Sequence, residues 1–148
     1  MTAAIREPGC ELCDLSVPVA WAGEKFSVIV VDDANYPGFC RVIWRDHVRE
    51  MSDLSDDDRL LLNEAVFQVE QAVRETMQPL KVNVASLGNV VPHLHWHIIP
   101  RYADDAHFPA PVWAQAVRAT DPDILAARRA LSNQLGAAIA RRFNRTEK

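Results

Sequence analysis

Three histidines occupy alternate positions near the middle of the chain, at His93, His95 and His97. In a β-strand, alternate side chains point to the same face and lie about 7 Å apart along it. This spacing therefore predicts a row of three imidazoles on one face of a strand, with apolar residues on the other. Imidazole is a common ligand of zinc, copper and iron, and it is also a nucleophile near neutral pH. The pattern thus indicates either a metal site or chemistry at phosphorus.

A second candidate group is the C-x-x-C pair formed by Cys10 and Cys13. The only other cysteine is Cys40, and three cysteines are too few for a disulfide scaffold. In a reducing compartment, a C-x-x-C pair indicates half of a metal site or a redox pair, and it is also compatible with two free thiols. A redox role of the thioredoxin kind is not favoured, because no βαβ pattern surrounds the pair.

Two short segments in the first third of the chain are expected to form neighbouring strands. Residues 26–31 are rich in β-branched side chains, and the turn-forming stretch 32–38 separates them from a second apolar segment at 39–44. A helix is expected to start after Ser55, because three aspartates follow in the first turn and complement the helix dipole. Its apolar residues recur with helical spacing until Pro79.

The second half of the chain predicts a further pair of strands and one more helix. Residues 81–86 alternate polar and apolar side chains, as do residues 92–100 around the histidines. Residues 103–120 are expected to form an ordered loop, and a helix is expected from Asp121 to about Arg142. The inward residues of this helix are predicted to be Ile124, Leu131, Leu135 and Ile139. We therefore expect an α+β domain, an antiparallel sheet with helices packed on it.

The composition limits the classes of function. The chain has 148 residues, of which 49% are hydrophobic, which is enough for one domain with a core, here 1–148. The formal net charge of −4 argues against polymeric DNA or RNA as a partner. The first seven residues contain no apolar run, and no segment approaches the roughly 20 residues of a membrane-spanning helix. A cytoplasmic protein without a membrane partner is the expectation.

The segment His93-Leu-His-Trp-His-Ile-Ile99 resembles the H-φ-H-φ-H-φ-φ motif of the histidine triad (HIT) superfamily, in which φ is apolar. The resemblance extends over residues 10–102, and residues 103–143 would form a carboxy-terminal loop and helix. Pro37-Gly38, the strand that follows and His47 are similar to another segment of the family. Phe39 and Trp44 depart from it, because the family often has His and Pro there. The resemblance implies a HIT-like antiparallel sheet of about five strands with helices packed on it.

The same resemblance implies an activity and assigns roles to two histidines. Enzymes of this family are nucleotide hydrolases and nucleotidyl transferases that cleave at the α-phosphorus. Their substrates include nucleoside phosphoramidates and dinucleoside polyphosphates. By analogy, His95 would be the nucleophile that forms a nucleotidyl-histidine intermediate, and His97 would donate to a phosphate oxygen. A backbone carbonyl that accepts from the other nitrogen of His95 would set its tautomer.

Four polar residues are candidates for contacts with the substrate. Asn83 and Asn89 are predicted to hold phosphate oxygens or to assist the leaving group, and Ser86 is a further candidate for that role. Asp32, or its neighbour Asp33, corresponds to the place where the family holds the ribose hydroxyls. Turn formation explains Ser86 and Asp32 equally well. The base pocket would involve apolar residues of the first strands, such as Phe26 or Ile29.

Zinc-carrying members of the family complete a site with the first histidine of the triad. Here the ligands would be Cys10, Cys13, His47 and His93, a Cys₂His₂ set suited to a structural, tetrahedral Zn²⁺ ion. The family is typically homodimeric, so a homodimer is expected. A non-catalytic alternative stays open at this point: a nucleotide- or metal-binding module that an effector partner reads.

Overall fold

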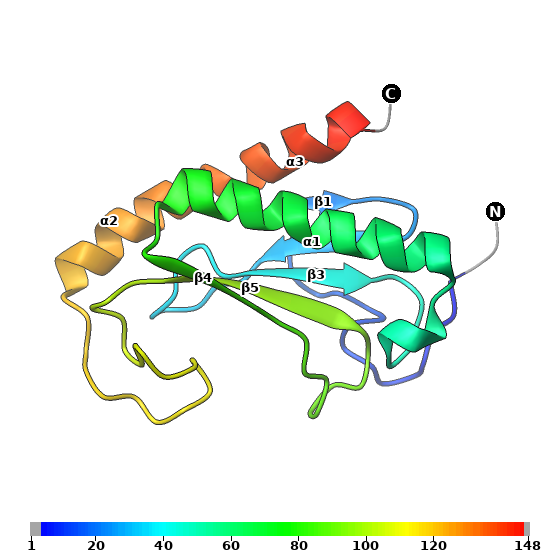
Figure 1. Ribbon diagram of the computed structural model, residues 1–148, viewed down its shortest axis with the longest axis horizontal. Helices are drawn as coiled ribbons and strands as arrows, with labels where there is room; N and C mark the ends of the chain where they lie inside the picture. The colour runs from blue at the N-terminus through cyan, green and yellow to red at the C-terminus, as the bar shows by residue number, and fades with distance from the viewer. Residues whose placement is uncertain (1–3, 147–148) are drawn as a thin grey trace.

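The computed structural model describes residues 4–146 and consists of one five-stranded antiparallel sheet with helices on one face (Figure 1). The strands follow the order β1-β2-β3-β5-β4 across the sheet. Their bounds are β1 Trp21–Ala22, β2 Phe26–Val30, β3 Cys40–Trp44, β4 Lys81–Ala85 and β5 His95–Arg101. The predicted α+β class and the antiparallel sheet of about five strands with helices packed on it are therefore confirmed.

Helix α1 (Asp56–Met77) runs along the sheet, as the periodicity of its apolar residues predicts. The Ser55 side chain caps it by accepting a hydrogen bond from the backbone N–H of Asp58, and the helix ends at Gln78 in a left-handed conformation. The main core forms between its buried face and one face of the sheet. The helix contributes Leu62, Ala65, Val69, Ala72, Val73 and Met77 to this core.

The carboxy-terminal helical region differs from the sequence prediction of one continuous helix. The structure has two helices, α2 (Pro122–Ser132) and α3 (Leu135–Thr146), separated by Asn133 and Gln134. Leu135 and Ile139 are buried in the main core as predicted, whereas Ile124 and Leu131 are exposed. The prediction for these two residues was wrong, because the helix is interrupted after α2 and only α3 packs into the core. The sequence analysis also missed the two-residue strand β1 and a short 3₁₀ helix, η1 (Met51–Asp53).

The register of the sheet determines which side chains face away from the helices. Arg41 pairs with His97 and Ile43 pairs with His95 between β3 and β5. Paired residues of antiparallel strands share a face, so these four side chains lie on the same side. Val42 and Ile98 are on the opposite face and belong to the main core.

Two segments without regular secondary structure cover parts of the face that carries the histidines. The amino-terminal segment places Leu12 against Ile29 and Ile43 in a second apolar cluster. The predicted loop 103–120 is confirmed as irregular, and its Val112 packs against a third cluster that contains Phe39. Arg41, which pairs with Ile29, and His97, which contacts Phe39, therefore lie beside these covered parts.

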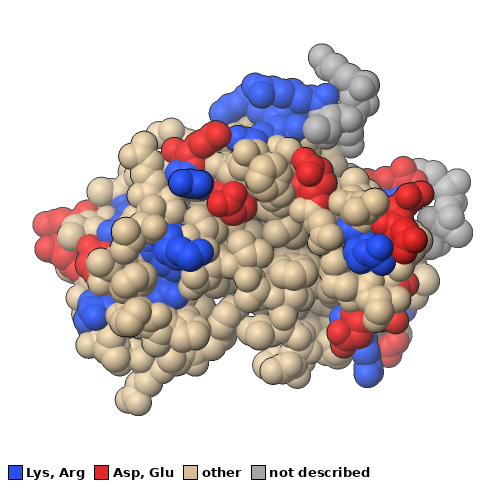
Figure 2. Space-filling view, viewed as in Figure 1, with Lys and Arg blue, Asp and Glu red and all other residues tan. Residues whose placement is uncertain are grey.

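The surface of the protein carries mixed charge. Figure 2 shows acidic and basic side chains interspersed around the rim of one face, with basic side chains gathered over α3. Within residues 4–146, none of the helices is long and apolar enough to cross a membrane.

Candidate functional site

The side chains of the three histidines of the triad are buried. His95 and His97 lie in β5, and His93 lies in the segment just before it. The rings of His95 and His97 meet edge to face with their centres 4.9 Å apart. The predicted alternation is therefore present, with Leu94 and Ile98 in the main core behind the imidazoles.

The tautomer of His95 is set by the backbone. Its Nδ1 lies 2.6 Å from the carbonyl oxygen of His93, and only a protonated Nδ1 can donate to that oxygen. Nε2 of the neutral ring is then left with a free lone pair. This is the contact that the sequence analysis required of a nucleophilic histidine.

The environment keeps both imidazoles of β5 neutral at physiological pH. Burial lowers the pKa of His95, and the nearby positive charge of Arg41 lowers it further. The hydrogen bond that His95 donates to the carbonyl oxygen of His93 acts in the opposite direction and is outweighed. Burial, His95 and Arg41 together lower the pKa of His97 to about 4. Nδ1 of His97 is buried without a hydrogen-bond partner among the described residues. Neutral rings of this kind can act as a nucleophile and as a neutral donor.

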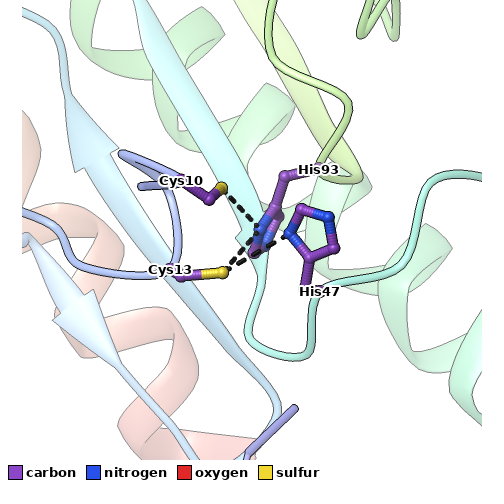
Figure 3. A group of neighbouring side chains, drawn as sticks. All are labelled: Cys10, Cys13, His47 and His93. Carbon is purple, nitrogen blue, oxygen red and sulfur yellow. Dashed lines mark hydrogen bonds between the residues drawn. The ribbon is translucent and has the colours of Figure 1, made fainter. Parts of the chain in front are cut away.

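The predicted metal ligands converge from three separate segments (Figure 3). Cys10 and Cys13 lie in the amino-terminal segment, His47 follows β3, and His93 precedes β5. Their four ligand atoms all lie within 4.8 Å of one another. Nδ1 of His93 is 3.5 Å from both sulfur atoms, and Nδ1 of His47 is 3.4 Å from Sγ of Cys13.

These distances fit a tetrahedral zinc ion. Zn–S bonds of about 2.3 Å and Zn–N bonds of about 2.0 Å place neighbouring ligand atoms about 3.3–3.8 Å apart. The outer contacts also fit, because Nε2 of His93 donates to the carbonyl oxygen of Trp44 at 2.5 Å and leaves Nδ1 free for a metal. The backbone N–H of Glu7 donates to Sγ of Cys13. The donor set and its contacts therefore fit the predicted structural zinc site.

Of the four residues predicted to contact the substrate, Ser86 and Asn83 form hydrogen bonds with residues of β5, whereas Asn89 and Asp32 are exposed. The Ser86 hydroxyl donates to the carbonyl oxygen of His95 at 2.7 Å, and a cavity of 370 Å³ opens between these two residues and η1. Oδ1 of Asn83, in β4, accepts from Nη1 of Arg101 at 2.6 Å, which leaves its amide N–H groups for a ligand. Asn89 is exposed in the turn before the triad. Asp32 is also exposed, and its contact is with Arg129 of α2.

The sequence analysis missed two residues of this face. Trp113, in the loop 103–120, places its ring edge to face against His97, with the centres 5.1 Å apart. Arg41 lies beside His97 in β3. A single charge inside an otherwise apolar strand was a usable signal for Arg41, whereas no local pattern connects Trp113 with β5. Of the two residues proposed for a base pocket, Ile29 lies on the histidine face and Phe26 lies in the core behind it.

Comparison with known proteins places these features in context. A family model described as the HIT domain matches residues 19–104. The chain is 28% identical over 111 residues to Protein hit of Bacillus subtilis (strain 168), which covers 70% of this chain and 76% of that protein.

Two solved structures show the same arrangement of elements. A histidine triad protein from Bradyrhizobium japonicum is 31% identical with a TM-score of 0.63, and the match covers 80% of this chain and 90% of that chain. A Zn-bound histidine triad family protein from Mycobacterium smegmatis is 20% identical with a TM-score of 0.59, and the match covers 91% and 94% of the two chains.

Proposed function

The chain belongs to the HIT domain family of nucleotide-binding hydrolases and transferases, and we propose that it cleaves nucleotides at the α-phosphorus through a nucleotidyl-histidine intermediate. The proposed substrates are nucleoside phosphoramidates or dinucleoside polyphosphates. The observation that carries the proposal is the hydrogen bond between Nδ1 of His95 and the carbonyl oxygen of His93. It presents an unprotonated Nε2 on a face with further neutral donors.

The proposed reaction has two steps. Nε2 of His95 attacks the α-phosphorus and forms a P–N bond, while the bond from phosphorus to the leaving group breaks and that group takes up a proton from solvent water. His97, and Asn83 with its free amide N–H groups, donate to the phosphoryl oxygens as negative charge develops on them. Water or another acceptor then attacks phosphorus, loses its proton and releases His95.

The intermediate itself provides the test of this function. The protein is mixed with adenosine phosphoramidate, quenched in base after milliseconds to seconds, and digested for mass spectrometry. We expect a mass increase of one adenylyl group on the peptide that contains His95. Absence of both adduct and turnover across a panel of nucleotides would favour the non-catalytic nucleotide- or metal-binding module instead.

We further propose that the Cys₂His₂ cluster binds one Zn²⁺ ion with a structural role. The cluster joins the amino-terminal segment to the segments that flank β3 and β5. All four ligand positions come from the protein, so no open position is left for a substrate. The bound ion would hold His93, and with it the carbonyl oxygen that orients His95.

Replacement of Cys13 by serine should release the metal. We expect the zinc content to fall from about one ion per chain to less than about a tenth of that, because a neutral hydroxyl replaces a thiolate. The melting temperature should fall by roughly 10 °C. A ligand present at a concentration far above its Kd stabilises the folded state by about 3–4 kcal/mol, and the variant loses this stabilisation. Elemental analysis and calorimetry measure both quantities.

The control for this experiment is His97→Ala, which leaves the cluster untouched and should retain zinc. Loss of zinc from His97→Ala together with retention in Cys13→Ser would contradict the structural site. That result would indicate a metal ion held by the triad histidines.

A homodimer formed edge to edge is also proposed. Strand β4 lies at one edge of the sheet, and its Val84 side chain is exposed. An unpaired edge with apolar side chains is a site for pairing with a second chain. Sedimentation at micromolar concentration would give the mass of the particle. A cytoplasmic location and the absence of polymeric nucleic-acid partners stay predictions from the sequence.

A further inference from the structure

Arg41 is a charged residue in strand β3, between the buried residues Cys40 and Val42. Its partners across the neighbouring strands are His97 of β5 and Ile29 of β2. Because paired residues of antiparallel strands share a face, the guanidinium group lies on the face of His95 and His97. It also lies between the triad and Ile29, which is a candidate for the nucleoside pocket.

No acceptor within residues 4–146 pairs with this guanidinium group. Nε of Arg41 is buried and has no hydrogen-bond partner, and the guanidinium carbon lies 5.8 Å from the centre of the Phe39 ring. Six other arginines form ion pairs with carboxylates, namely Arg6, Arg59, Arg101, Arg128, Arg129 and Arg142. A buried N–H group without an acceptor destabilises a fold, and a bound ligand is one of the few reasons for retaining it.

The chemistry of the guanidinium group indicates which ligand this is. Its planar set of N–H donors can bind two oxygen atoms of one phosphate group at the same time. The positive charge of Arg41 already acts on this site, since it contributes to the low pKa of His97. No carboxylate of residues 4–146 forms an ion pair with it.

Resting on the proposed function, we propose that Arg41 binds the non-bridging oxygens of the phosphoryl group that His95 attacks. The positive charge then offsets the negative charge of the substrate phosphate on a protein whose net charge is −4. Arg41 is thereby a substrate-binding residue that makes the site select nucleotides over nucleosides. Neutral donors such as Asn83 complete the contacts of the phosphoryl group.

The test compares a nucleotide with the nucleoside that lacks its phosphate. The zinc-loaded wild-type protein is first titrated by calorimetry with the four ribonucleoside monophosphates, and the tightest is chosen together with its nucleoside. The same two ligands are then titrated into Arg41→Gln, Arg41→Lys and Arg45→Gln. Arg45 is the matched control, because it is exposed beyond the end of β3 and donates to the carbonyl oxygen of Glu24.

We expect Arg41→Gln to weaken monophosphate binding by about 10- to 100-fold, as the loss of a charged hydrogen bond would do. Binding of the nucleoside should change by less than about twofold, since no charge interaction with it is lost. Arg41→Lys should keep part of the affinity because it keeps the charge without the planar fork. Arg45→Gln should bind both ligands as the wild type does.

Three results would overturn the proposal. Monophosphate affinity in Arg41→Gln that matches the wild type would show that Arg41 does not contact the phosphate, while nucleotide binding and the proposed function stand. Equal losses for monophosphate and nucleoside would show that Arg41 only shapes the wall of the pocket. Absence of binding of any monophosphate to the wild type would overturn both this proposal and the proposed function.

Discussion

Replacement of His95 by asparagine should lower kcat/KM for the proposed nucleotide substrates by at least about a thousandfold, the scale of loss expected when a nucleophile is removed. The asparagine amide can still donate to the carbonyl oxygen of His93, as Nδ1 of His95 does in the structure. It offers no lone pair at the position of Nε2, so no P–N bond can form. The fold should survive, with a melting temperature within a few degrees of the wild type.

The measurement is steady-state turnover together with the mass of the base-quenched protein. The control is Ser86→Ala, which removes the hydrogen bond to the carbonyl oxygen of His95 and leaves both imidazoles in place. We expect this control to lose about tenfold or less, because it removes a neutral hydrogen bond worth about 1 kcal/mol. The nucleophile assignment would be wrong if His95→Asn kept more than a tenth of the wild-type kcat/KM.

The alternation of the triad was enough to predict a face of the sheet, because a strand has a strict period of two residues. The structure accordingly places His95 and His97 together on one side and Ile98 in the core on the other. The C-x-x-C spacing alone indicated half of a metal site, but the complete set of four zinc ligands was accessible only through the family resemblance. His47 and Cys13 are 34 residues apart, and no periodicity predicts their contact.

Residues outside regular elements were harder to predict. Asp32, or its neighbour Asp33, was a candidate for the ribose contact, and that role stays a prediction. The contact found for Asp32 is with Arg129, in a helix that starts 90 residues later. Ile124 and Leu131 had helical spacing and still face solvent, because the position of a helix break depends on tertiary packing. The contacts of Trp113 and Asn83 depend on how the loop 103–120 folds back over β5.

That loop is held by a buried ion pair, whose rupture is the second change with a large expected effect. Arg101 is 2% exposed and Asp105 is 1% exposed, and two hydrogen bonds join them. Asp105 also accepts from the backbone N–H groups of Tyr102, His107 and Phe108. Arg101 in turn donates to the carbonyl oxygen of Ala110 and to Asn83. The pair thus connects the loop to β5, which contains Arg101, and through Asn83 to β4.

Replacement of Asp105 by asparagine should lower the free energy of unfolding by about 3–5 kcal/mol, because it leaves the Arg101 charge buried without its partner. Urea unfolding of the zinc-loaded protein measures this quantity. The matched control is the adjacent Asp104→Asn, which removes an exposed carboxylate from its pair with Arg128. Because the Asp104 carboxylate is 44% exposed, we expect the loss of this pair to cost only about 1 kcal/mol.

The pH dependence of the loss identifies charge as its cause. Burial alone would raise the pKa of Asp105, but the hydrogen bonds from Arg101 and from the backbone outweigh it and lower the pKa. The carboxylate therefore stabilises the fold fully above its unfolded pKa of about 3.9, and this contribution is lost as the pH falls below that value towards the folded pKa. The difference between wild type and Asp105→Asn should be constant from about pH 5 to 8 and narrow below about pH 4.

A difference that stays unchanged at pH 3, or a loss as small as that of Asp104→Asn, would contradict this account. The ion pair also bears on the site, because Asn83 accepts from Arg101 and the loop carries Trp113 against His97. We therefore expect Asp105→Asn to weaken nucleotide binding even at temperatures where the variant is folded. The zinc cluster lies in other segments of the chain and should remain loaded, so metal content separates this local loosening from general unfolding.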